Sequence, residues 1–242
     1  MMSGKIVAIA GAGGTLGPSV VRAFSAAGAT LALAGREEGK LAALLDAAGM
    51  PAGRRLASAA DLLDESAAAA WAGKILKAFG RIDAVLHLVG GYKGGGAIAE
   101  IATADWKALH DMLVMTTLNI VRAFAGPLKA SGHGRFIAVT SPKARVPTSR
   151  SALYSMAKSA SDALVRALAD EVKGSGTTAN LIEVDSIDAP EARGSEAQRS
   201  DDPKKAYGRS TPAEEIAAAM LYLCSEEAAT INGARLPLTG RG

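Results

Sequence analysis

Cysteine is nearly absent from this sequence: Cys224 is the single one among 242 residues. A chain with one cysteine cannot form an internal disulfide bond, which favours a reducing compartment, so we expect a cytoplasmic protein. Apolar residues recur around Cys224 at helical spacing, and this indicates a small buried side chain rather than a catalytic thiol.

Long apolar runs are also missing. The first such run begins at Ile6, is interrupted by Gly11 and Gly13, and is not followed by the pattern of a signal-peptide cleavage site. No uninterrupted apolar segment approaches the roughly 18 residues that a membrane-spanning helix needs. We therefore expect neither a secretory signal nor a membrane partner.

Dense runs of one charge are absent as well. The chain has 27 basic and 24 acidic residues, a net charge of +3, and no stripe of Lys and Arg of the kind that nucleic-acid binders carry. The three histidines, His87, His110 and His133, have no metal-ligand spacing and no cysteine or acidic cluster beside them. We expect neither a nucleic-acid partner nor a metal site.

Short apolar runs alternate with longer, alanine-rich stretches of helical period. This alternation predicts an α/β fold with a mainly parallel sheet and helices on both of its faces, and the length is common for one domain, 1–242. The expected strands are Ile6–Ala10, Thr30–Ala34, Ile82–Val89, Arg135–Thr140, Thr178–Val184 and a short one around Leu236. The expected helices are Leu16–Ala27, Glu37–Ala48, Asp64–Phe79, Thr103–Lys129, Ser151–Lys173 and Pro212–Ser225.

One segment, Asp188–Ser210, interrupts the alternation. It is polar, rich in charge and poor in apolar anchors. Its composition indicates a surface loop or short helices. A solvated excursion and a lid over a ligand cleft both fit this position, before the last long helix.

Glycines crowd the turn between the first expected strand and the first expected helix. Gly11, Gly14 and Gly17 let a chain turn sharply and bring its backbone close to a pyrophosphate, which the helix N-terminus then binds. A P-loop would need a lysine after the spacer, and none follows. Thr15 and Leu16 complete a turn that favours a dinucleotide.

Arg36 follows the second expected strand, where a dinucleotide-binding domain recognises the adenosine ribose. Its planar, permanently charged guanidinium suits a phosphate, so we expect a preference for NADP(H), with NAD(H) as the alternative. Two other interpretations stay open: Glu37 could redirect Arg36 or bind the ribose itself, and Arg36 could be a solvated structural residue.

A tyrosine and a lysine stand four residues apart in a helical stretch, at Tyr154 and Lys158. Residues at this spacing share a helix face, and a cation near a phenol favours the phenolate and lowers its pKa from about 10. Ser141 follows a strand and precedes Tyr154 by thirteen positions. Its hydroxyl could hold a carbonyl oxygen while Tyr154 transfers a proton.

Together these motifs resemble those of the short-chain dehydrogenase/reductase family, along essentially the whole chain. Ser141, Tyr154 and Lys158 match the family's catalytic serine, tyrosine and lysine in kind and spacing. Asp61-Leu62 resembles the pair beside the adenine, and Gly90 the last residue of an Asn-Asn-Ala-Gly motif. The cofactor-binding residues that the resemblance implies are Gly11, Gly14, Thr15, Leu16, Gly17, Arg36, Asp61, Leu62, Gly90, Tyr154, Lys158 and Ile187.

The resemblance implies a doubly wound, Rossmann-type sheet of about seven strands, an NADP(H)-dependent oxidoreductase and a homotetramer or homodimer. Tyr154 would be the general acid or base towards a small carbonyl or alcohol substrate. Lys158 would lower the pKa of Tyr154 and hold the nicotinamide ribose, and Ser141 would position and polarise the substrate oxygen.

Several positions depart from the family pattern. The Asn-Asn-Ala-Gly motif is replaced by His87-Leu88-Val89-Gly90. The family's fourth catalytic residue is an asparagine on the long helix, and here it should fall near Leu113 or Val114, which are both apolar. Thr15, Val184-Asp185 and Ala189 stand where glycine, Pro-Gly and threonine are usual. These losses favour an alternative function, an NADP(H)-binding regulator or scaffold that has lost turnover. The run through Gly91 and Tyr92 also resembles the dihydropteridine reductase branch.

Overall fold

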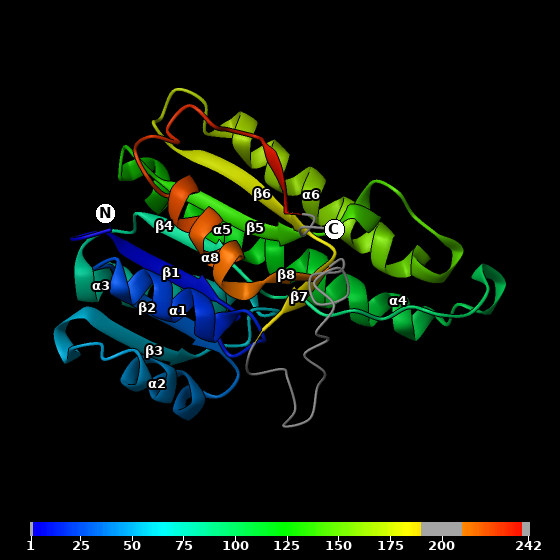
Figure 1. Cartoon of the computed structure of the whole chain (residues 1–242), viewed down its shortest axis with the longest axis horizontal. Coiled ribbons are helices and arrows are strands. Elements are labelled where there is room, and N and C mark those ends of the chain that lie inside the picture. Colours follow the sequence, from blue (N-terminus) through cyan, green and yellow to red (C-terminus); the bar gives the residue numbers. More distant parts are fainter. Residues whose placement is uncertain (1, 190–209, 239–242) are drawn as a thin grey trace, which may run out of the picture.

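The computed structural model describes residues 2–189 and 210–238, and its centre is a parallel sheet of seven strands in the order β3-β2-β1-β4-β5-β6-β9 (Figure 1). The order reverses between β1 and β4, so the sheet is doubly wound, as the sequence predicts. The strands are β1 (Ile6–Ala10), β2 (Thr30–Gly35), β3 (Arg55–Ala59), β4 (Ala84–His87), β5 (Arg135–Thr140), β6 (Thr178–Val184) and β9 (Arg235–Leu238).

A strand that the sequence analysis did not identify, β3, forms one edge of the sheet beside β2. It begins with Arg55, and only Ser58 in it is fully buried. Because most of its residues are only partly buried, this edge strand has no apolar run, and its sequence gives only a weak strand pattern. Two short strands, β7 (Ser186–Asp188) and β8 (Ser210–Pro212), pair in a separate two-stranded sheet.

Helices cover both faces of the main sheet. They are α1 (Gly17–Ala26), α2 (Glu38–Ala47), α3 (Glu65–Phe79), α4 (Thr103–His110), α5 (Thr116–Ala130), α6 (Ala152–Glu171) and α8 (Ala213–Leu223). Short 3-10 turns lie at Ala52–Arg54, Ile98–Glu100, Pro142–Ala144 and Ser149–Ser151. Local signals set some of the boundaries: the Asp64 carboxylate accepts a hydrogen bond from the Ser66 amide at 2.8 Å to begin α3, and Gly80, at φ +81°, ends it.

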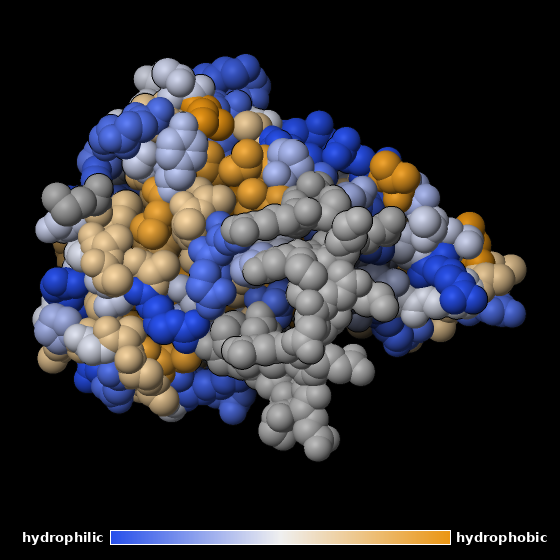
Figure 2. All heavy atoms as spheres, viewed as in Figure 1, coloured by the Kyte–Doolittle hydropathy of each residue, from blue (hydrophilic) through white to orange (hydrophobic). Residues whose placement is uncertain are grey.

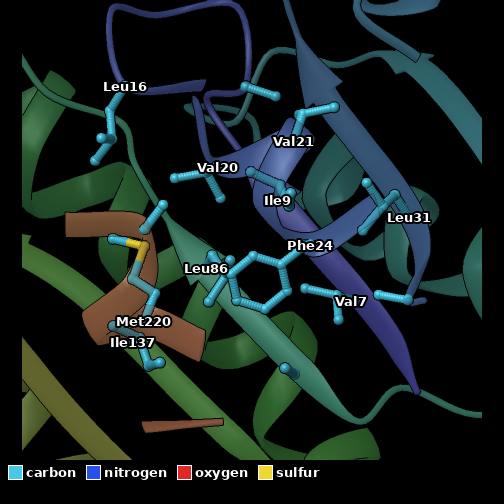
Figure 3. Packing of buried hydrophobic residues seen from close by; sticks show 14 of the residues in the cluster. Val7, Ile9, Leu16, Val20, Val21, Phe24, Leu31, Leu86, Ile137 and Met220 are labelled. Atoms are coloured by element: carbon cyan, nitrogen blue, oxygen red, sulfur yellow. The ribbon is translucent and has the colours of Figure 1, made fainter. Parts of the chain in front are cut away.

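Successive residues of each central strand point to opposite faces, which produces two apolar cores. On one face Val7 and Ile9 of β1 pack with α1, α2 and α8, and Figure 3 shows Phe24 of α1 against the sheet near Leu86 and Met220. On the other face Ala8 and Ala10 pack with α3, α5 and α6. Both cores end at the same edge of the sheet, where the strands reach their carboxyl ends.

The long helix expected over Thr103–Lys129 is interrupted. Between α4 and α5 the chain makes one wider, π-helical turn at Asp111–Met115. The hydroxyls of Thr116 and Thr117 donate to the carbonyls of Met112 and Leu113, at 2.5 and 2.6 Å. Such turns are frequent at functional sites, because they redirect backbone groups without ending the helix.

Buried charges join α6, β6 and β9. Arg235 of β9 forms ion pairs with Asp162 of α6 and with Glu183 of β6, the latter at 2.7 Å. The two carboxylates are almost completely buried, and Arg145 also binds Glu183, at 3.0 Å. Arg235 therefore compensates two negative charges that water does not reach.

We predict that Arg235→Met lowers the free energy of unfolding by about 3–5 kcal/mol, because it leaves two buried carboxylates without their shared partner. Urea unfolding at pH 7 measures this loss. The matched control is Lys129→Met, which removes an exposed pair with Glu171 and should cost no more than about 1 kcal/mol. If both variants lost the same small amount of unfolding free energy, the stabilising role assigned to Arg235 would be contradicted.

Candidate active site

The glycine turn after β1 depends on missing side chains. Gly11 has φ +79°, and a Cβ on it would lie 2.8 Å from the amide nitrogen of Val89. A Cβ on Gly17, the first residue of α1, would lie 1.7 Å from the carbonyl oxygen of Ala12. Glycine is therefore required at both positions, and the turn brings the N-terminus of α1 to the carboxyl edge of the sheet.

A cavity of about 540 Å³ lies beside this turn, at the β2 side. Its wall includes six of the residues predicted or discussed as nucleotide contacts: Gly11, Gly14, Arg36, Asp61, Leu62 and Gly90. Glu37 and Lys40 also line it. Lys40 was missed in the sequence analysis, although its position, four residues after Arg36 at the start of a helix, was a usable signal.

Asn119 holds part of the wall of this cavity in place through hydrogen bonds. Its side-chain amide donates to the carbonyls of Leu62 and Leu63, at 3.1 and 2.9 Å, and the residue is buried. It therefore fixes the segment after β3, and its side-chain amide is engaged there.

A second cavity, of about 330 Å³, continues from the first along the carboxyl edge of the sheet. Gly14, Leu88, Val89 and Gly90 line both cavities, so the two form one path. The second cavity is also lined by Thr15, Leu16, Val139, Thr140, Tyr154, Lys158, Val184, Asp185, Ser186 and Ile187.

Tyr154 lies in the first turn of α6, and Ser141 lies at the end of β5 beside it. Burial raises the pKa of Tyr154 to about 12, and hydrogen bonding with Ser141 opposes this shift without cancelling it. The negative charge of Asp162 and that of Asp185 raise the pKa further. The sequence analysis expected the cation to lower this pKa; in the structure burial has the largest effect and the pKa is raised instead.

Lys158 lies one helical turn after Tyr154 and is almost fully buried. Its ammonium nitrogen donates to the carbonyl of Val139 at 2.8 Å and lies 6.0 Å from the centre of the Tyr154 ring. Burial lowers the pKa of Lys158 to about 8, against the opposing effect of the Asp162 carboxylate. At pH 7 the ammonium form still predominates.

Two contacts near Tyr154, a ring contact and an ion pair, were not predicted in the sequence analysis. The ring of Tyr92 lies edge-on to that of Tyr154, with 5.1 Å between ring centroids, and Tyr92 is exposed. Lys143 binds Asp185 at 2.6 Å, joining the ends of β5 and β6 next to Ser141. Only contacts in space reveal these pairs, because the partners are far apart in the sequence.

The positions that depart from the family pattern are filled by other groups. Leu113 is buried with Leu109 and Ala157 and has no polar side-chain atom. His87 is buried at the end of β4, and its Nε2 lies 3.0 Å from the hydroxyl of Thr117. Burial, with the charge of Lys158, lowers the pKa of His87 to about 3.

Ile187 lies in β7, next to the second cavity, and β7 pairs with β8. The expected lid, Asp188–Ser210, thus begins and ends in paired strands. Its interior, 190–209, lies outside the described residues.

The remaining sequence expectations concern thiols, metals and membranes. Cys224 is buried, which raises the pKa of its thiol to about 12, so it is a core residue as expected. Within residues 2–189 and 210–238, no group of three or more His, Cys, Asp or Glu side chains could hold a metal ion. Over the same ranges, the helices are too short or too polar to cross a membrane.

Comparison with known proteins gives consistent matches. A family model described as enoyl-(acyl carrier protein) reductase matches residues 11–240. Meso-2,3-butanediol dehydrogenase of Serratia marcescens is 30% identical over 98% of this chain and 93% of its own length. For 7alpha-hydroxysteroid dehydrogenase of Escherichia coli K12 the identity is 24%, over 100% and 95%.

A solved structure shares the fold. A short-chain oxidoreductase from Pseudomonas aeruginosa PAO1, described as containing an atypical catalytic centre, superposes with a TM-score of 0.88 and 23% identity, over 99% of this chain and 97% of that one. With a family model and curated relatives that align over nearly the full length, these matches show that the chain belongs to the short-chain dehydrogenase/reductase family of oxidoreductases.

Proposed function

We propose that this chain transfers hydride between NADP(H) and a small carbonyl or alcohol substrate, with Tyr154 as the general acid or base. The observation that carries this proposal is that Tyr154 and Lys158 line the same cavity, which continues into the glycine turn after β1. When bound, the nicotinamide supplies the hydride chemistry, and the protein supplies orientation and proton transfer.

The residues present fit a dinucleotide. Gly11, Gly13 and Gly14 line the cavity beside the N-terminus of α1, so backbone rather than side chains would face a pyrophosphate there. At the adenosine end Arg36 and Lys40 line the cavity, and within residues 2–189 and 210–238 neither forms an ion pair with a carboxylate. Three carboxylates, Glu37, Asp61 and Asp111, line the same cavity, and the two cations at the end of β2 support a 2′-phosphate over a bare ribose.

The proton chemistry follows from the pKa values. A pKa of about 12 keeps the Tyr154 hydroxyl protonated at pH 7, which is the form that donates to the oxygen of a carbonyl during reduction. Ser141, which hydrogen-bonds with Tyr154, would hold the same oxygen. Lys158 would stabilise the phenolate that remains and bind the nicotinamide ribose.

A second candidate function is a nucleotide-binding regulator without turnover. It is favoured by the apolar Leu113 and by the raised pKa of Tyr154, which both make the site a weaker proton-transfer device. The presence of Ser141, Tyr154 and Lys158 together supports the enzyme over this alternative.

We further propose a homodimer or homotetramer, as is usual in the family. Charged side chains surround an area of apolar surface over α8 (Figure 2), where Tyr222 is half exposed. The substrate is a small molecule, and the relatives direct a first screen towards vicinal diols, diketones and hydroxysteroids, with aldehydes, quinones and pterins added.

We predict that Arg36→Ala weakens NADPH binding about 10- to 100-fold and leaves NADH binding nearly unchanged, because a hydrogen bond to a charged group is worth about 1.5–3 kcal/mol. Calorimetric titration with NADPH and with NADH measures the two affinities. Arg122→Ala, which removes an exposed arginine paired with Glu65, is the control. Equal losses for the two nucleotides would refute the 2′-phosphate assignment.

We predict that Tyr154→Phe lowers turnover by roughly 10²–10⁴ with little change in NADPH affinity, because the ring stays and only the proton donor is lost. NADPH absorbance with a substrate from the screen measures turnover. Tyr222→Phe removes a surface hydroxyl and should change nothing.

Ser141→Ala should mainly reduce turnover, whereas Lys158→Ala should reduce both turnover and NADPH binding. Full activity in Tyr154→Phe would show that the catalytic assignment is wrong. Tight NADPH binding without any substrate in the screen would favour the regulator.

A further inference from the structure

His87 is a buried, polar residue at the active-site edge of the sheet. It ends β4, and its neighbours in the two adjoining strands are Ala10 of β1 and Ala138 of β5. Both alanines belong to the core beneath α5 and α6, and their small, uncharged side chains leave the imidazole room on that face. Thr117 of α5 contacts the imidazole there, at 3.0 Å.

The hydrogen bonds around Thr117 fix the tautomer of His87. The Thr117 hydroxyl has one proton and lies 2.6 Å from the carbonyl oxygen of Leu113, which can only accept. The hydroxyl therefore donates to Leu113 and must accept from His87. Hence the proton of the neutral imidazole is on Nε2, and Nδ1 is an acceptor. Among the described residues, this buried Nδ1 has no hydrogen-bond partner.

Lys158 has hydrogen-bond donors that are complementary to the acceptor Nδ1 of His87. Its ammonium has three donors, and one of them goes to the carbonyl of Val139, the residue after Ala138. Its positive charge reaches His87, since it contributes to the lowered pKa of the imidazole. Lys158, which also lines the second cavity, thus has spare donors near a buried acceptor that has no partner among the described residues, and an unmatched buried acceptor is costly.

We propose that His87 Nδ1 accepts a hydrogen bond from the Lys158 ammonium through one water molecule, and that His87 is thereby a positioning residue for Lys158. The inference rests on the proposed role of Lys158 in the reaction. It gives a function to a histidine that stands in place of an asparagine of the family motif.

The same geometry makes His87 an anchor and excludes it as a proton carrier. A proton passed from Nε2 to Thr117 would end at the Leu113 carbonyl, which also accepts from the Ser161 hydroxyl at 2.7 Å. A carbonyl oxygen cannot pass the proton onward. With a pKa of about 3, His87 is also neutral at pH 7.

The first test needs neither substrate nor cofactor. Histidine labelled with ¹⁵N reports the Nδ1 resonance of His87 between pH 6 and pH 10. Because Lys158 has a pKa of about 8, we expect that resonance to change near pH 8, although His87 does not titrate there. The change should vanish in Lys158→Met.

The other titratable group that acts on Lys158 is Asp162, on the same helix. Asp162→Asn should shift the pH of the ¹⁵N change downward, since Asp162 raises the pKa of Lys158, and should not abolish it. An Nδ1 resonance that stays constant across pH 8, or behaves identically in Lys158→Met, would overturn the proposal.

The second test compares His87→Asn, whose amide can place an acceptor near the position of Nδ1, with His87→Leu, which has none. A hydrogen bond to the ammonium stabilises its charged form, so His87→Leu should lower the pKa of Lys158. We expect the alkaline limb of the kcat profile to move down by about one pH unit and kcat to fall about tenfold, with KM little changed.

His87→Asn should restore both properties in large part. Ser161→Ala, which removes the other hydroxyl from the Leu113 carbonyl, should keep the wild-type profile. A wild-type profile in His87→Leu would count against the anchor, as would equal damage in both His87 variants. If the wild type turns over no substrate, the proposed function fails, and the ¹⁵N titration still decides the role of His87.

Discussion

The proposed chemistry of this protein depends on a lysine ammonium, that of Lys158, which is almost completely buried. Burial makes the charged form of Lys158 costly, and its pKa falls to about 8. The surroundings limit that fall: the Val139 carbonyl accepts one of its hydrogen bonds, and Asp162 stands one helical turn away on α6. Asp162 is itself buried and needs Arg235, which in turn binds Glu183. The buried ammonium of Lys158 is thus accompanied by a set of buried charges that joins α6, β6 and β9.

This set of charges also explains the state of Tyr154. In the chain alone its phenol is more difficult to ionise than in water, since burial and the carboxylates of Asp162 and Asp185 act in the same direction. Ser141 supplies the main opposing interaction, and Lys158 lies 6.0 Å from the ring centre. The Tyr154 hydroxyl therefore stays protonated at pH 7, which is the form that the proposed reduction needs.

Much of this arrangement follows from local patterns in the sequence. Buried parallel strands give apolar runs, and the turn at Gly11 and Gly17 admits no side chain, so both are legible without a structure. Tyr154 and Lys158 are recognisable because helical spacing alone puts them on one face. The edge strand β3 gives no apolar run, and the wide turn at Asp111–Met115 interrupts a stretch of unbroken helical period. Hydrogen bonds from threonine side chains to backbone carbonyls accompany that turn, and no composition rule predicts them.

The contacts that sequence reasoning could not supply are those between distant positions. His87 and Leu113 stand out in the sequence only as departures from the family pattern, and nothing in the sequence links them with Thr117 or Ser161. In space they form one chain of hydrogen bonds with a fixed direction, from the imidazole to the hydroxyl and on to the carbonyl exposed by the wide turn. Relative to the family pattern, the helix has the apolar Leu113 and the strand has His87, whose Nδ1 has no partner among the described residues. The proposed water bridge would connect this acceptor with Lys158. Because the hydrogen bonds from His87 end at a carbonyl, this arrangement cannot conduct a proton. Under the proposed mechanism, protons would therefore reach Tyr154 from the open side of the cavity.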